Sequence, residues 1–297
     1  MDIEPDIEAF LAMFKLRSKH TSAAYRQDIR CFESFISSEN ILDWRDISPT
    51  TIRKFVSFRF KLGLSSRSIA RELSSLRSLF RFLKTNKRID GNPLEGVRTP
   101  KMKYRLPRAL DVDAISKLLN YSPVTALEIR DKAILELLYS SGLRVSEVTS
   151  LNMSDLDFEG KEVRVLGKGN KERIVPVGKF AIKSLRDWLM VRSRFGNDEK
   201  ALFLSRRGTR LASRSVQARL RVWARRFSDQ GDVHPHMLRH SFASHLLESS
   251  GDLRAVQELL GHASISTTQT YTHLDFQHLA TVYDRAHPRS RKKRPSG

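Results

Sequence analysis

The sequence predicts a mainly α-helical protein of two domains, with a small antiparallel sheet in the second domain. Three observations lead to this fold class. Apolar residues recur at intervals of three and four through the first hundred residues. A stretch with three prolines at 91–108 then interrupts the pattern. Two β-branched runs at 161–167 and 172–178 flank a Gly-Asn pair, which is typical of a β-hairpin.

The first domain is expected to contain four amphipathic helices, at 7–17, 21–38, 50–61 and 65–84. Ser48-Pro49-Thr50 and Ser65 stand where helix N-caps belong. The apolar residues of the last helix share one face, which predicts the core of this domain: Ile69, Leu73, Leu76, Leu79, Phe80 and Leu83.

The second domain is expected to be mostly helical around the hairpin. Helices are predicted at 111–120, with Asp111 as its cap, and at 127–140, 179–193, 213–228, 240–250, 252–260 and 266–285. The predicted domain plan is a helical domain at 1–95, a linker at 96–108, a mixed α/β, mostly helical domain at 109–288 and a basic tail at 289–297.

The charge of the chain indicates a polyanionic partner. The 297 residues include 53 Lys and Arg against 33 Asp and Glu, for a formal charge of +20. Such an excess repels itself in the compact state and favours binding to nucleic acid. An anionic membrane is the alternative, but no basic amphipathic helix with aromatic edges supports it. A structural RNA-binding role also fits the charge.

Two segments concentrate this positive charge. Lys61–Arg88 holds eight basic residues and one acid, and Arg206–Arg226 holds eight arginines and no acid. A solvated helix face explains either segment alone, but the total charge favours DNA. The predicted DNA-binding residues are Arg67, Arg71, Lys84, Arg88, Arg206, Arg207, Arg210 and Arg214.

Several features point to the cytoplasm. The chain begins with an acidic segment that lacks the basic and apolar regions of a signal peptide, and no stretch is long and apolar enough to span a membrane. Cys31 is the single cysteine, so neither an intramolecular disulfide nor a cysteine-rich zinc site is expected.

Metal and nucleotide chemistry are both disfavoured. His236 and His240 have the spacing of a helical zinc pair, but Pro235 is expected to disrupt the helix there and no HExxH glutamate lies between them. No GxxxxGK[ST] loop is present, and the glycines at 167 and 169 lead into a strand. No metal or cofactor is therefore expected.

A protein nucleophile with cationic clamps fits better. Arg144 follows Gly142, which is expected to end a helix, and should lie in the first turn of the next helix. His236 and Arg239 are three residues apart, on one helix face. His262 follows a helix-ending glycine and Tyr271 lies nine residues later. Taken singly, each of these residues is more often a surface or packing residue.

Their order along the chain is more specific. Arg144, a GKGNKER hairpin with Lys168, HxxR at 236–239, LGH at 260–262 and YTH at 271–273 follow one another. This order resembles the Arg…Lys…His-x-x-Arg…His…Tyr signature of the tyrosine recombinase (phage integrase-type) family. SGLRVSE and GKGNKERIVPVG are similar to its Xer branch. The resemblance is strong from 109 to 288 and general in the first hundred residues.

The resemblance implies a helical core-binding (SAM-like) domain followed by a catalytic domain. It also implies six catalytic residues: Arg144, Lys168, His236, Arg239, His262 and Tyr271. Two guanidiniums can neutralise the charge that a phosphodiester develops when it is attacked. His236 is the candidate general base for Tyr271, whose unperturbed pKa is about 10. The resemblance assigns protonation of the leaving 5′-oxygen to Lys168, and we expect His262 to bind the phosphate or assist proton transfer.

The resemblance further implies DNA strand cleavage and religation without metal or ATP, in tetramers on DNA. A XerD-like second recombinase and a role in resolving chromosome dimers at cell division are implied in the same way. The segment 276–288 is expected to dock on a neighbouring protomer, with an intramolecular closing helix as the alternative. A type IB topoisomerase-like enzyme and a non-catalytic nucleic-acid-binding protein are the competing functions.

Overall fold

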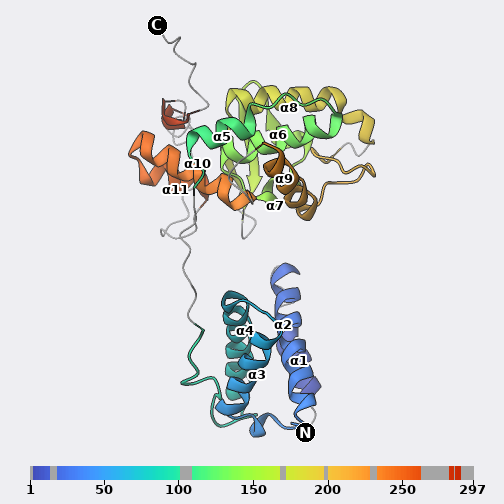
Figure 1. Cartoon of the computed structure of the whole chain (residues 1–297), viewed down its shortest axis with the longest axis vertical. Coiled ribbons are helices and arrows are strands. Elements are labelled where there is room, and N and C mark those ends of the chain that lie inside the picture. The colour runs from blue at the N-terminus through green and yellow to red at the C-terminus, as the bar shows by residue number, and fades with distance from the viewer. Residues whose placement is uncertain are drawn as a thin grey trace. The chain divides into compact units, whose positions relative to one another are not determined.

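The computed structural model describes residues 3–13, 19–100, 109–167, 172–196, 200–227, 233–261, 281–283 and 285–288, with the backbone alone at 19–21 and 227. The chain divides into two compact units, Met1–Arg105 and Leu106–Gly297. The helices of both units are labelled in Figure 1.

The first unit is a bundle of helices: α1 (Ile3–Ala12), α2 (Lys19–Ser38), α3 (Pro49–Lys61) and α4 (Ser66–Thr85), with a short 3-10 turn at Trp44–Asp46. The helices expected at 21–38, 50–61 and 65–84 are confirmed to within two residues. The one expected at 7–17 begins at Ile3 and ends at Ala12, because the apolar spacing that faces the core already starts at Ile3. Residues 14–17 of that prediction lie outside the described residues.

The predicted N-caps in this unit are confirmed. The Ser48 hydroxyl accepts a hydrogen bond from the backbone N–H of Thr51, and Pro49 occupies the first helical position. Ser65 caps α4 in the same way, through the N–H of Ser68. These caps satisfy amide groups that would otherwise lack partners at each helix start.

The predicted apolar face of α4 forms the centre of the first core, since all six of its side chains are fully buried. Rings from α2 and α3 pack around it, with Phe32 and Phe80 edge to face at 6.0 Å. Val97, expected in the linker, is also buried in this core, and the Arg77 guanidinium donates to its carbonyl oxygen at 3.2 Å.

The second unit is built around α6 (Ala126–Ser141), which packs against α8 (Lys179–Arg192) and α10 (Pro235–Ser250) (Figure 1). The other helices are α5 (Val112–Leu119), α7 (Val145–Ser150), α9 (Ser213–Phe227) and α11 (Leu253–Leu260), with 3-10 turns at Met153–Asp155 and Ser193–Phe195. Asp111 caps α5 as expected. The predicted helices are confirmed, apart from the start of α10 and the undescribed part of 266–285.

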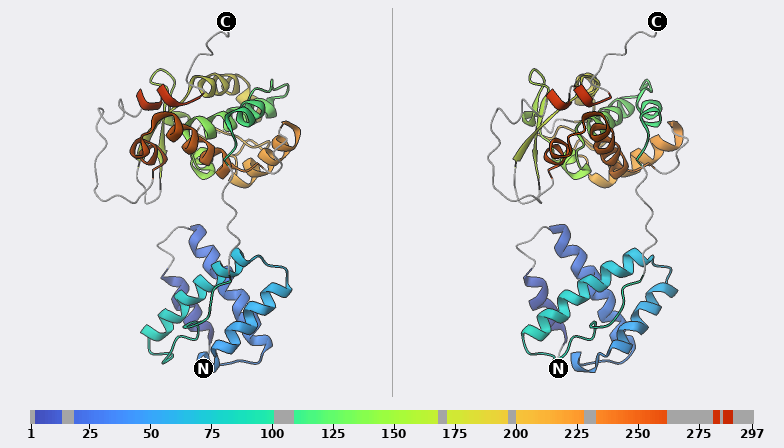
Figure 2. Two further views of the ribbon diagram at one scale, coloured as in Figure 1. Left: turned by 60° about the vertical axis from the view of Figure 1, so that its left-hand side comes forward. Right: turned by 90° about the vertical axis from the view of Figure 1, so that its left-hand side faces the viewer.

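The predicted hairpin is confirmed and extended by one strand. β2 (Glu162–Leu166) pairs antiparallel with β3 (Glu172–Pro176), and β1 (Leu156–Asp157) pairs with β2. The sheet order is β1-β2-β3, and Figure 2 shows this sheet at one side of the unit. Val163 faces Val175, and Val165 faces Arg173, so these four side chains share the buried face of the sheet.

One sequence expectation about α10 was wrong. The helix begins at Pro235, five residues before the expected start at 240, and Pro235 does not disrupt it. A proline at the first helical position loses nothing, because its missing N–H would have no intrahelical acceptor there. The His234 ring caps the helix instead, by accepting the N–H of Met237 at 3.3 Å. His236 and Arg239 therefore share the first turns of one helix.

The described part of the C-terminal segment packs on its own chain. Tyr283, Ala286 and His287 are buried in the core of the second unit. The hydroxyls of Tyr283 and Ser140 are hydrogen-bonded at 3.1 Å, and the rings of Tyr283 and His287 stack at 4.8 Å. In the described residues 281–283 and 285–288, apolar side chains therefore fill an intramolecular site, and docking of 276–288 on a neighbouring protomer stays a prediction. Residues 276–280 lie outside the described residues.

Within the described ranges, none of the helices has the length and apolar character required to cross a membrane.

Candidate active site

The loop between α6 and α7 positions the first predicted clamp residue. α6 ends at Gly142, whose left-handed φ of 57° lets the chain turn away from the helix. Arg144 follows as the N-cap of α7, with extended backbone, one position before the first turn where it was expected. Its side chain is 37% exposed, so its guanidinium can reach a ligand from solvent.

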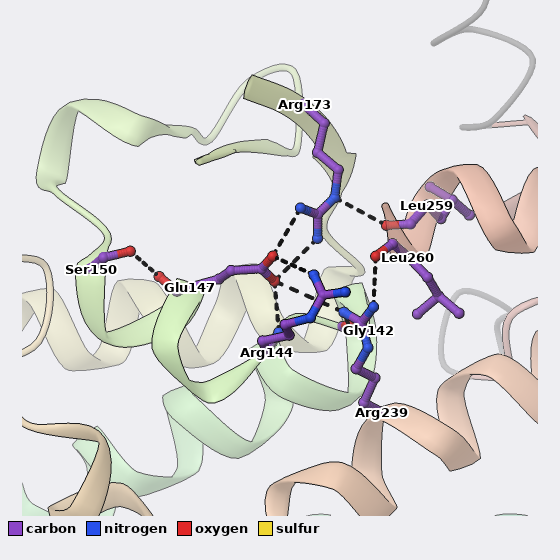
Figure 3. A network of polar contacts seen from close by, with 8 residues as sticks. All are labelled: Gly142, Arg144, Glu147, Ser150, Arg173, Arg239, Leu259 and Leu260. Carbon is purple, nitrogen blue, oxygen red and sulfur yellow. Dashed lines mark hydrogen bonds and ion pairs between the residues drawn. The ribbon is translucent and has the colours of Figure 1, made fainter. Parts of the chain in front are cut away.

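Glu147 lies at the centre of the site (Figure 3). Its carboxylate accepts the backbone N–H of Arg144 at 2.7 Å and the Nη1–H of the same residue at 3.0 Å. It also accepts two parallel hydrogen bonds from Arg173, Nη1 to Oε1 at 2.9 Å and Nη2 to Oε2 at 3.1 Å. The Glu147 side chain is buried, so these donors take the place of water.

Arg239, the second predicted clamp residue, enters the same cluster from α10. Its Nη1–H donates to the carbonyl oxygen of Gly142 and its Nη2–H to that of Leu260, both at 2.6 Å. Its Nη1 lies 3.9 Å from Oε2 of Glu147. The two carbonyls come from the C-terminal ends of α6 and α11, where the helix dipole favours a cation. Arg239 is thereby fixed between two helix ends.

The charges in this cluster are unequal. Burial raises the pKa of Glu147, but the hydrogen bonds and charge of Arg173 and Arg144 outweigh this effect and leave the pKa below its ordinary value. Burial, together with the neighbouring charge of Arg144, lowers the pKa of Arg239 to about 10. With a pKa of about 10, Arg239 is protonated at pH 7, and the single Glu147 carboxylate faces three guanidiniums.

Of the six predicted catalytic residues, the structure describes three. It brings the guanidiniums of Arg144 and Arg239 to one carboxylate. His236 lies on α10, one turn before Arg239, and is exposed. Gly261 ends α11 in the left-handed conformation, as expected for the glycine that precedes His262. Lys168, His262 and Tyr271 lie outside the described residues.

Two residues of the cluster were missed from the sequence. Glu147 stands three residues after Arg144, the spacing of a capping box, and this spacing could have indicated its role. The role of Arg173 was missed because Arg173 and Ile174 are neighbours in a strand and face opposite sides of the sheet. The apolar Ile174 would be expected on the buried side and Arg173 on the exposed side. The register decides otherwise: pairing with Val165 turns Arg173 inward and Ile174 outward.

The predicted DNA-binding residues of the first unit are all exposed, but three of them have acidic partners. Arg71 pairs with buried Asp28 at 2.7 Å, and Arg88 with buried Asp6 at 3.0 Å. The Lys84 ammonium lies 3.7 Å from Glu95. Among the described residues no acid is paired with Arg67. Ion pairs within the protein therefore account for part of the positive charge of this segment.

The second basic segment divides in the same way. The Arg210 guanidinium donates to the carbonyl oxygens of Thr149, Ser150 and Leu151 at the end of α7, and to Asn152 Oδ1 at 2.6 Å. In contrast, Arg206, Arg207 and Arg214 are exposed, and no acid in the described ranges pairs with their side chains. Within the described residues, no group of three potential metal-ligating side chains comes together.

The arrangement can bind an anion without a metal. Arg144 and Arg239 offer planar sets of N–H donors whose geometry matches two oxygens of one phosphate. Only one carboxylate balances three guanidiniums, so the cluster retains positive charge for a ligand. His236, on the same helix as Arg239, adds an imidazole that can accept or donate a proton.

Known proteins are similar to this chain in sequence and in fold over nearly its whole length. Residues 108–278 match the phage integrase family, and residues 7–87 match the phage integrase N-terminal SAM-like domain. Tyrosine recombinase XerC of Chromobacterium violaceum is 52% identical over 278 residues, which cover 93% of this chain and 92% of that protein. Tyrosine recombinase XerC of Actinobacillus pleuropneumoniae serotype 7 is 45% identical over 285 residues, or 96% and 93% of the two chains.

Solved structures of recombinases also match this chain. The XerH site-specific recombinase bound to its palindromic difH substrate, in a post-cleavage complex, superposes with a TM-score of 0.67 at 25% identity. The match covers 89% of this chain and 79% of that one. A lambda integrase dimer (residues 75–356) bound to a core site has the same fold, with a TM-score of 0.68 at 20% identity over 91% and 100% of the two chains.

The chain belongs to the phage integrase family of tyrosine recombinases. Within that family it is of the XerC type, since XerC proteins are 45–52% identical to it over nearly its whole length.

Proposed function

We propose that this protein cuts and rejoins DNA at specific sites through a 3′-phosphotyrosyl link on Tyr271, and that it acts in the cytoplasm with a XerD-like second recombinase to resolve chromosome dimers at cell division. The observation that carries the chemical part is the cluster in which Arg144 and Arg239 meet at Glu147 with an excess of positive charge. Near full-length similarity to XerC proteins supports the biological part.

The first step is attack of the Tyr271 phenolic oxygen on the scissile phosphorus. A bond forms between that oxygen and phosphorus, and the bond from phosphorus to the 5′-oxygen breaks. The negative charge that develops on the two non-bridging oxygens is stabilised by Arg144 and Arg239. Because hydrogen bonds to main-chain carbonyls hold Arg239 before DNA arrives, little reorganisation is needed at the moment of reaction.

Two proton transfers accompany this step. His236 accepts the proton of the Tyr271 hydroxyl, and Lys168 gives a proton to the leaving 5′-oxygen. His262 donates a hydrogen bond to the phosphate. The products are a 3′-phosphotyrosyl link and a free 5′-hydroxyl, so a hydroxyl from a second strand can reverse the reaction. Each step exchanges one phosphoester bond for another, so no ATP is consumed.

Assembly follows from the number of strands exchanged. Two duplexes contain four strands to be cut, and each active site cuts one, so a complex of four protomers is required. The exposed arginines Arg67, Arg206, Arg207 and Arg214 contribute contacts to the DNA. Lys84, Arg71, Arg88 and Arg210 lie on the same basic segments, but their structural partners limit what they add.

The test is trapping of the covalent intermediate on nicked suicide duplexes that carry chromosome-dimer resolution sites. We expect the wild-type protein to form an adduct that resists denaturation, and Tyr271→Phe to form none. Addition of EDTA should leave the yield unchanged. The proposal is wrong if no adduct forms on any site, if Tyr271→Phe still forms one, or if EDTA abolishes it. A XerD-like partner is supported if complete strand exchange occurs only when that second protein is added.

A further inference from the structure

Arg173 is the most deeply buried arginine of the cluster. Its side chain is 8% exposed, against 11% for Arg239 and 37% for Arg144. All three nitrogens of its guanidinium are engaged inside the protein: Nη1 and Nη2 donate to Glu147, and Nε donates to the carbonyl oxygen of Leu259 at 3.3 Å. Figure 3 shows this side chain on the opposite side of the Glu147 carboxylate from Arg239. Arg173 thus directs all three nitrogens to groups of the protein itself, two of them to the Glu147 carboxylate.

The hydrogen bonds around Glu147 show what Arg173 contributes. Paired parallel hydrogen bonds between a guanidinium and a carboxylate are the strongest geometry for such a pair. Arg173 makes this pair, whereas Arg144 makes one side-chain bond to Glu147 and Arg239 remains 3.9 Å away. Arg173 thus compensates most of the Glu147 charge and leaves the charges of Arg144 and Arg239 available.

The consequence of losing Arg173 follows from burial. Glu147 is 5% exposed, so water cannot compensate its charge in place of the lost guanidinium. The carboxylate would then draw on Arg144 and Arg239, the nearest remaining cations. Arg144 and Arg239 would then pair with Glu147 instead of the phosphate. The carboxylate would also repel the phosphate directly.

We propose that Arg173 is a positioning residue for the recombination reaction: it neutralises and fixes Glu147, so that Arg144 and Arg239 keep their charge and orientation for the scissile phosphate. This inference rests on the proposed function, in which those two arginines bind that phosphate.

The connections of Arg173 suit this role. It stands on β3 opposite Val165, and its hydrogen bonds join the sheet to α7 through Glu147 and to the end of α11 through Leu259. A side chain at Gly261 would come within 3.1 Å of the Arg173 guanidinium, so the glycine that ends α11 also makes room for it. Arg173 thereby links β3, α7 and the end of α11, three segments that carry predicted catalytic residues or adjoin them.

The experiment measures single-turnover adduct formation on suicide duplexes at saturating protein. We expect Arg173→Gln to slow adduct formation at least about tenfold, since small misplacements in an active site cost up to about a hundredfold. The DNA concentration for half-maximal binding should change less than about threefold, because Arg173 does not reach the surface. Arg164→Gln, on the exposed face of β2 in the same sheet, is the matched control and should cleave at the wild-type rate.

The second substrate carries a neutral methylphosphonate in place of the scissile phosphate. If uncompensated negative charge causes the defect, the ratio of wild-type to Arg173→Gln rates should fall several-fold on this substrate. The double variant Arg173→Gln/Glu147→Gln removes both charges and should cleave the ordinary phosphate faster than Arg173→Gln alone. A merely structural role would slow both substrates equally, with no gain in the double variant, and would overturn the proposal.

Two further outcomes are assigned. If Arg173→Gln does not fold, as judged by its thermal unfolding, Arg173→Lys replaces it. Lysine retains the charge without the paired geometry, so cleavage should be slower than in the wild type. The ratio of the rates on the phosphate and methylphosphonate substrates should equal that of the wild type. A changed ratio there contradicts the proposal. Wild-type cleavage with an equally fast Arg173→Gln overturns this inference alone, whereas absence of any wild-type adduct overturns the proposed function.

Discussion

Gly178 and Tyr283 are so close that a methyl group on the glycine would lie 2.5 Å from the tyrosine hydroxyl. The same Ser140 hydroxyl that contacts the Tyr283 hydroxyl at 3.1 Å accepts the backbone N–H of Gly178 at 2.8 Å. The start of α8 and the C-terminal segment are therefore fitted to each other through one buried serine. This relationship explains why the segment packs within its own chain.

Gly178→Ala should consequently destabilise the second unit. The backbone φ at Gly178 is −66°, so alanine meets no conformational strain and the cost comes from the clash alone. Overpacking of this kind costs about 1–3 kcal/mol in the free energy of unfolding. Urea denaturation measures the change. Gly91→Ala, where nothing lies within 4 Å of the added carbon, is the control. A cost no larger than that of the control contradicts the prediction, and adding Tyr283→Phe should recover part of the loss.

Arg210→Ala should lower stability, whereas Arg214→Ala should lower DNA affinity. Arg210 donates to three carbonyl oxygens at the end of α7, and hydrogen bonds of charged groups contribute about 1.5–3 kcal/mol. Arg214 is exposed on α9, and its loss should change stability by less than about 0.5 kcal/mol. Denaturation and DNA-binding titrations on both variants separate the effects. The opposite pattern would show that Arg210 is the DNA contact.

Arg67 and Arg71 provide the same comparison in the first unit. Arg71→Ala removes the charged partner of Asp28, whose side chain is 1% exposed and keeps the Ser75 hydroxyl as a donor, and should lower the free energy of unfolding by about 1–3 kcal/mol. Arg67→Ala should leave stability unchanged and should reduce the slope of log affinity against log salt concentration by about 0.9 for the lost phosphate contact. An unchanged salt slope for Arg67→Ala would remove that residue from the DNA interface.

His245 should make stability depend on pH. Burial lowers the pKa of this histidine, whose Nδ1 lies 2.9 Å from the Tyr139 hydroxyl, against the opposing effects of Glu248 and Asp111. The unfolded chain then binds a proton more readily than the folded one, so stability is fully present above the unfolded pKa of about 6.5 and falls below it. One such group contributes a slope of at most about 1.4 kcal/mol per pH unit.

Urea denaturation at pH 7.5 and 5.5 measures this effect. The wild-type protein should lose more stability over that interval than His245→Gln, in which the titrating group is absent. Equal losses in the two proteins would show that His245 does not titrate differently in the folded and unfolded states.

The sequence predicted most of the fold, because the local signals agree with the tertiary structure. The apolar face of α4, the caps at Ser48, Ser65 and Asp111 and the hairpin strands all follow from interactions within a few residues. The exception at Pro235 has a local cause as well. Proline is tolerated at the first position of a helix and disruptive further inside, and periodicity alone did not locate the helix start.

The candidate site was predicted only in part. The order of motifs indicated Arg144, His236 and Arg239; the structure places the two arginines beside the Glu147 carboxylate, and their catalytic roles stay a prediction. It also assigns internal partners to Arg71, Arg88 and Arg210, which the sequence placed among the DNA contacts. Charge counts along a chain register how many cations are present but not which of them have a buried acid or a carbonyl oxygen beside them.

The sequence by itself determined the class of protein, its helices and hairpin, and the residue types that its chemistry requires. The tertiary structure alone decided that Glu147 and Arg173 lie at the centre of the site, and that Tyr283, Ala286 and His287 are buried in their own chain. The physical reason is distance along the chain. Periodicity and capping act over three or four residues, whereas Arg173 meets a carboxylate 26 positions away and Tyr283 a serine 143 positions away. Only the packing of strands and helices brings such groups together.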